Sequence, residues 1–73
     1  MSLAQAPVAK PVRIAGVRNG PSASYRLMEM GLIAGAEVEV IGRAPLGDPL
    51  QVRVGDYMLS LRTSDAENID IVE

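Results

Sequence analysis

The side chains best able to do chemistry in this sequence are carboxylates that occur in pairs. Glu37 and Glu39 are two residues apart in an alternating segment, so they share one face of an expected strand, and Asp65 and Glu67 have the same spacing. Such pairs could act as general acid and base. The chain, however, has no histidine and no cysteine, and its only lysine, Lys10, lies near the N-terminus. Because exposed carboxylates are ordinary surface groups, we interpret the pairs as solvated and predict no enzymatic activity.

The residues that could bind a metal in this sequence are also of types with ordinary structural roles. The oxygen donors do not follow the spacing of a calcium loop. Methionines such as Met28, Met30 and Met58 offer soft sulfur, but methionine more commonly fills a core or makes an adaptable contact surface. Tight ferrous or zinc sites draw on imidazole or thiolate, and neither is present. We therefore predict no cofactor, and a weak carboxylate site for Fe²⁺ stays open as an alternative with unknown ligands.

Charge and hydropathy restrict the partners. Seven basic and nine acidic residues give a net charge of −2, which disfavours a nucleic-acid binder that relies on phosphate neutralisation. No apolar run approaches the ~18 residues of a membrane-spanning helix, so direct membrane insertion is not expected. The N-terminal segment lacks both a basic start and a long apolar stretch, which disfavours a signal peptide. The expected location is the cytoplasm.

The elements that position these side chains begin after a proline- and alanine-rich segment. Residues 1–11 show no periodicity and are predicted to be a flexible N-terminal arm. Residues 11–19 alternate, which predicts a strand with Val12 and Ile14 inward and a bulge or bend at Gly16. Turn residues follow at 19–22.

A short helix is predicted from Ser22 or Ser24 to Met30, with one of the two serines as its N-cap. Gly31 lies where a helix needs a left-handed residue to end, and that motif predicts an apolar contact between Leu32 and Leu27. Gly35 then suits the third position of a type II turn. The next strand, residues 37–40, is expected to place its valines inward.

The 50–61 segment predicts a hairpin whose two-residue turn begins at Gly55. That turn fixes the strand register and places six apolar residues on one face. They are Leu50, Val52, Val54, Tyr57, Leu59 and Leu61.

Residues 63–68 predict a helical turn in which Ser64 and Glu67 have capping-box spacing, and residues 69–73 predict a last strand with Ile69 and Ile71 inward. Together these elements predict one all-β domain over residues 12–73, a small five-stranded barrel with one short helix between the first two strands.

The segment 43–49, with two prolines and a glycine, predicts a stiff loop. Leu46 in this loop has two interpretations. It either packs back over the barrel or forms an exposed recognition point on a rigid scaffold.

Three motifs, "RLMEMGLIAG", "APLGDP" and "LSLRTSDAENI", occur in the order and spacing of the FeoA family of bacterial ferrous-iron uptake proteins. The chain resembles that family from Tyr25 to Ile71. The resemblance implies an SH3-like barrel and association with FeoB, a membrane permease with a cytosolic G domain. It also implies a cytoplasmic protein that reaches the membrane through this partner.

We therefore predict a non-enzymatic interaction module that docks on the FeoB-like GTPase permease. The predicted partner-binding residues are on the short helix and the proline loop: Tyr25, Arg26, Glu29, Met30, Arg43, Leu46 and Asp48. Arg26 and Arg43 are expected to pair with partner carboxylates. Two alternatives remain, a weak Fe²⁺ carrier or sensor, and a peptide-binding or weakly self-associating SH3-like module with Met28, Met30 and Leu46 as apolar anchors.

Overall fold

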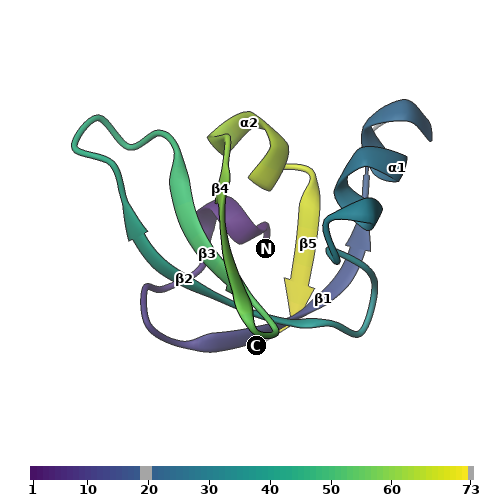
Figure 1. Ribbon diagram of the computed structural model, residues 1–73, viewed down its shortest axis with the longest axis horizontal. Coiled ribbons are helices and arrows are strands. Elements are labelled where there is room, and N and C mark those ends of the chain that lie inside the picture. Colours follow the sequence, from purple (N-terminus) through teal and green to yellow (C-terminus); the bar gives the residue numbers. More distant parts are fainter. Residues whose placement is uncertain (19–20, 73) are drawn as a thin grey trace.

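The computed structural model describes residues 1–18 and 21–72, with the backbone alone for residues 21–24. Five antiparallel strands form one sheet in the order β4-β3-β2-β1-β5 (Figure 1). The strands are β1 (Pro11–Val17), β2 (Glu37–Arg43), β3 (Leu50–Val54), β4 (Tyr57–Leu61) and β5 (Ile69–Val72). The helices are η1 (Leu3–Gln5), α1 (Pro21–Glu29) and α2 (Thr63–Ala66). No helix within the described residues is long and apolar enough to cross a membrane.

The sheet curls around a single core, and two register shifts help it to bend. One lies in β1 between Ile14 and Gly16, which confirms the predicted bulge, and the other lies in β2 between Val40 and Gly42. α1 connects β1 to β2, and α2 connects β4 to β5 (Figure 1). The predicted fold class, a mostly β domain with five strands and a short helix between the first two, is confirmed.

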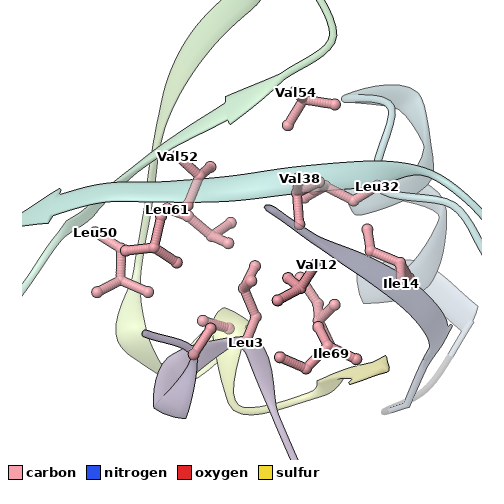
Figure 2. Close-up of a cluster of buried hydrophobic side chains, with 14 of the residues drawn as sticks. Leu3, Val12, Ile14, Leu32, Val38, Leu50, Val52, Val54, Leu61 and Ile69 are labelled. Atoms are coloured by element: carbon pink, nitrogen blue, oxygen red, sulfur yellow. The ribbon is translucent and has the colours of Figure 1, made fainter. Parts of the chain in front are cut away.

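The core is aliphatic and draws on every strand (Figure 2). Val12 and Ile14 of β1 and Ile69 and Ile71 of β5 point inward, as their alternation predicts. The predicted hairpin register is also confirmed, because every expected pair from Val54–Tyr57 to Leu50–Leu61 is present. Gly55 begins the turn with φ +59°.

Tyr57 departs from the expected inward face. It is 46% exposed, whereas Leu61 at the other end of β4 is buried and Leu59 is half-buried. Tyr57 lies next to the turn, where its hydroxyl donates a hydrogen bond to the carbonyl of Met30 at the end of α1. A phenol keeps its polar end paired in this way while part of its ring stays in water.

The N-terminal arm also differs from the expectation. Leu3 is completely buried, and Ala6 is 3% exposed. The guanidinium of Arg43 donates to the carbonyls of Ala4 (2.8 Å) and Ala6 (3.4 Å), which fixes the arm to the end of β2. The arm lacks periodicity because only isolated side chains enter the core, so no repeating pattern marks its contribution.

The helix end of α1 follows the prediction. Gly31 has φ +89°, its N–H donates to the carbonyl of Met28 (2.9 Å), and the N–H of Leu32 donates to the carbonyl of Leu27 (3.1 Å). These bonds define a Schellman motif, and both leucines are buried in the same core. Gly35, with φ +91°, and a bond from the Ala36 N–H to the Ile33 carbonyl (3.0 Å) confirm the type II turn.

The starts of both α-helices differ from the predictions. α1 begins at Pro21, so neither Ser22 nor Ser24 occupies the position before the helix, and the rest of the predicted 19–22 turn lies outside the described residues. α2 begins at Thr63, so Ser64 is inside the helix and the predicted capping box does not form. A distant carboxylate satisfies its first N–H instead, as described below.

Candidate functional site

Polar contacts join α1, α2 and the β2–β3 loop (residues 44–49) into one surface. Nη2 of Arg26 on α1 donates to both carboxylate oxygens of Asp65 on α2, at 3.0 and 2.9 Å. Oδ1 of Asp48 in the loop accepts the backbone N–H of Thr63, the first residue of α2, at 2.8 Å. The hydroxyl of Thr63 donates to the carbonyl of Gly47 at 2.9 Å. α2 is therefore fixed on one side to the helix and on the other to the loop.

We call this surface the helix–loop face, and Figure 1 shows its parts along one side of the molecule, with α2 between α1 and the loop. Its side chains are Tyr25, Arg26, Glu29, Leu46, Asp48 and Asp65. The face brings together most of the residues that the sequence singled out. They are arranged along a line rather than in a cluster, because α2 separates the two predicted groups.

Leu46 is the most exposed large hydrophobic side chain of the described residues, at 96%. Its loop is closed by backbone bonds from Gly47 to Ala44 (2.7 Å) and from Ala44 to Pro49 (3.1 Å), and Gly47 has φ +87°. These bonds hold the loop as a tight turn that directs the leucine into solvent. Leu46 therefore does not pack back over the barrel, and its role as a recognition point stays a prediction.

The remaining predicted partner-binding residues differ in how free their side chains are to contact a partner. Tyr25 is 66% exposed and Glu29 is exposed, whereas Met30 is half-buried against the core. Arg26 already has an intramolecular partner in Asp65, although its side chain stays 60% exposed. Arg43 is not on the helix–loop face by its contacts, because its guanidinium holds the carbonyls of the N-terminal arm.

Sequence reasoning missed the role of α2. The sequence presents Asp65 only beside Glu67 as a carboxylate pair, and Thr63 only as part of a helical turn. In the structure these residues contact Arg26 and Asp48, respectively. Arg26 and Asp65 are 39 positions apart, and Asp48 and Thr63 are 15 apart, so no local pattern in the sequence predicts these contacts. The cap of α2 comes from the β2–β3 loop, which is distant in the sequence, so the residues next to α2 carry no capping signal.

The other carboxylate pair lies on the outer side of β2. Glu39 forms an ion pair with Arg53 at 2.8 Å, and Glu37 is exposed. Both line a shallow hollow of about 360 Å³ between the start of β1 and the β3–β4 turn. Across the described parts of the chain, no three acidic side chains come together as a group that could hold a metal ion.

Comparisons with known proteins agree with this fold. Residues 1–73 match the family model of the FeoA domain. Over 46 residues, the chain is 44% identical to the Fe(2+) transport protein A/Fe(2+) transporter FeoB fusion protein of Porphyromonas gingivalis, a match that covers 63% of this chain and 6% of that protein. The chain thus spans a small part of that relative.

Two solved structures extend the comparison. Iron(II) transport protein A from Clostridium thermocellum has a TM-score of 0.92 and 31% identity, over 97% of this chain and 44% of that one. FeoA of Stenotrophomonas maltophilia, solved in complex with zinc and described as a prokaryotic SH3 domain protein, has a TM-score of 0.86 and 29% identity, over 99% of this chain and 89% of that one. The five-stranded fold is therefore SH3-like.

Proposed function

The chain belongs to the FeoA family, and from that membership we propose that it is a non-enzymatic accessory module of ferrous-iron uptake that docks on the cytosolic part of a FeoB-type GTPase permease. FeoA domains are associated with ferrous-iron transport, and a relative joins FeoA and FeoB in a single polypeptide. That fusion is the observation that carries the proposal. The module acts at the cytoplasmic side of the membrane through its partner.

The fusion has a physical implication for FeoA domains, whether or not they share a polypeptide with FeoB. A covalent linker holds two modules at an effective concentration on the order of millimolar, so a weak contact is sufficient. A FeoA domain on a separate chain needs a surface that provides the affinity itself. The helix–loop face supports this requirement with an exposed apolar side chain, Leu46, on a rigid loop and an exposed aromatic, Tyr25, on α1.

The composition of this face is that of a small docking surface. Interfaces depend on a few apolar or aromatic anchors that become fully desolvated, with polar groups around them. Leu46 can enter a pocket at little entropic cost, because its loop backbone is already fixed by the Asp48–Thr63 contact. Arg26 and Asp65 satisfy each other in the free domain, so they can lie at the interface rim without leaving an unpaired charge.

The test is calorimetric binding of this chain to the purified full-length permease in detergent. We expect wild type to bind and Leu46→Asp to lose about 30-fold or more in affinity, the effect of an anchor that contributes about 2 kcal/mol. Val72→Asp is the matched control, because Val72 is 56% exposed on β5 and is not part of the helix–loop face. Its affinity should equal that of wild type.

Two results would contradict the proposal at different levels. If Leu46→Asp and Val72→Asp bind equally well, the helix–loop face is not the docking surface. If wild type neither binds the permease nor changes its GTP turnover, docking itself is wrong. Thermal melting of each variant shows whether the domain is folded, so a loss of binding cannot be confused with unfolding.

A second candidate function is a weak carrier or sensor of Fe²⁺, and the zinc complex of the Stenotrophomonas relative favours it. Carboxylates would supply the ligands in this chain, since it has no histidine or cysteine. Anaerobic calorimetry with Fe²⁺ separates this candidate from docking. Heat of binding at micromolar metal without the permease supports a carrier, and its absence at high-micromolar metal eliminates one.

A further inference from the structure

One edge of the sheet is open. β4 is the last strand in the sheet order and pairs with β3 in continuous register, without a bulge. The two-residue turn makes Val54–Tyr57 a hydrogen-bonded pair, and such pairs alternate along an antiparallel ribbon. The N–H and C=O groups of Met58 and Ser60 therefore point away from β3, toward the edge. Both residues are exposed.

This edge has none of the usual protections against pairing with another strand. Proteins protect edge strands with charged residues, prolines, bulges or a covering segment. No residue from Tyr57 to Leu61 is charged or proline. The opposite edge is covered, because Ser2 forms a bridge with Asp70 and the Ile71 N–H donates to the carbonyl of Met1 at 2.9 Å. Within the described residues, only β4 offers an unprotected edge.

We propose that a second copy of this chain occupies that edge, with the two β4 strands antiparallel around a two-fold axis at Leu59. In this register Met58 of each copy lies opposite Ser60 of the other. Met58 and Ser60, whose backbone groups point to the edge, then form hydrogen-bonded pairs between the two copies. The backbone bonds from β4 to β3 stay as they are. A two-fold axis at Met58 or Ser60 would instead pair one of these residues with itself and leave the other opposite a residue outside the strand.

The charges at the ends of β4 favour the same register. Asp56 precedes the strand and Arg62 follows it, and both side chains are exposed. No ion pair joins either of them to another described residue. With the axis at Leu59, Asp56 of each copy lies opposite Arg62 of the other, so opposite charges meet at both ends of the shared ribbon. This complementarity identifies a second copy rather than an unrelated peptide as the occupant.

The covered β5 edge excludes the obvious competing arrangement. Pairing of β4 with β5 of the next copy would be head-to-tail and would produce a ring or a filament. Residues 1 and 2 already occupy that edge of β5. The assembly therefore closes as a dimer with one continuous sheet. Because only a five-residue strand is shared, the dimer is weak and depends on protein concentration.

Sedimentation equilibrium over a range of concentrations tests the dimer, and charge exchange tests its register. We expect wild type to associate reversibly at high concentration. Asp56→Arg alone and Arg62→Asp alone each place like charges opposite one another, which should weaken the dimer by about tenfold. The double variant restores opposite charges at both ends and should recover the wild-type association. Thermal melting checks that every variant is folded.

Amide hydrogen exchange of the wild type provides a measurement that needs no variant. Exchange at Met58 and Ser60 should slow as concentration rises, whereas exchange at Leu59, whose N–H points to β3, should not change. The proposal is overturned if wild type stays monomeric at the highest soluble concentration, if the double variant associates no better than the single ones, or if the slowed amides lie outside β4. Its outcome does not depend on docking to the permease.

Discussion

Gly31→Ala is the substitution that most directly tests how α1 is positioned. Gly31 has φ +89°, a backbone conformation that L residues rarely adopt. A Cβ atom there would also lie 2.8 Å from the hydroxyl of Tyr57 and 3.3 Å from Cγ1 of Val54. The first distance is too short for any real contact, so the tyrosine must move. Its hydroxyl would then leave the Met30 carbonyl that it now contacts.

The expected cost has two parts. The left-handed backbone costs about 1–2 kcal/mol for a residue with a Cβ, and loss of the Tyr57 hydrogen bond costs about 1 kcal/mol more. The sum, about 2–3 kcal/mol, is a large fraction of the roughly 4–11 kcal/mol of stability typical of a domain of this size. It corresponds to a fall in Tm of roughly 10–20 °C. Gly31→Val should be more destabilising, because a β-branched side chain adds further overlap.

Three glycine variants separate these parts in urea unfolding experiments. Gly35→Ala carries the backbone cost alone, about 1–2 kcal/mol, because Gly35 has φ +91° but no heavy atom within 4 Å of the added Cβ. Gly42→Ala is the matched control, with neither a left-handed backbone nor a neighbour within 4 Å, and should stay within about 0.5 kcal/mol of wild type. Adding Tyr57→Phe to Gly31→Ala removes the overlapping hydroxyl and should reduce the penalty toward that of Gly35→Ala.

Two results would contradict this account of the helix end. If Gly31→Ala is no more destabilising than Gly42→Ala, the left-handed helix end does not hold α1. If the penalty of Gly31→Ala is the same with tyrosine or phenylalanine at position 57, the contact with the hydroxyl contributes nothing. The first result would remove the physical basis for treating α1 as a rigid part of the helix–loop face.

Three further predictions concern the rest of the fold and the site. Leu3→Ala should cost about 2–4 kcal/mol in thermal unfolding, because Leu3 is completely buried; a change below 0.5 kcal/mol would show a loose arm. Asp48→Ala should cost about 1 kcal/mol by leaving the Thr63 N–H without its cap, whereas Asp48→Asn keeps an acceptor and should cost less. Arg26→Ala should cost less than about 1 kcal/mol, with a penalty that shrinks in high salt, because the Arg26 side chain stays 60% exposed; a large, salt-independent loss would mean that its pair with Asp65 is needed for packing.

Local patterns were sufficient wherever neighbouring residues set the structure. The hairpin register followed from its two-residue turn and alternating valines and leucines, since a slip of one residue would expose the whole apolar set. Gly31 and Gly35 were predictable because each occupies a position where a motif of fewer than seven residues requires a left-handed backbone.

Predictions failed where the structure depends on contacts between distant segments. Leu3 enters the core from an aperiodic arm, and Arg43 binds that arm instead of remaining free. The first N–H of α2 is capped by Asp48 from another loop rather than by a residue of its own segment. Each of these contacts joins two segments that are far apart in the sequence, and no local pattern connects them.

The sequence by itself determined the five strands, their inward faces except at Tyr57, the glycines that end α1 and form the turns, and the FeoA family, because alternation, turn glycines and ordered motifs are local properties. Only the tertiary structure decided that the helix and the proline loop share one face through α2, that Leu46 is exposed, and that β4 rather than β5 has an open edge. The physical reason is that closing the sheet brings together polar groups that are distant in the sequence. The hydrogen bonds between these groups then decide which surfaces stay exposed.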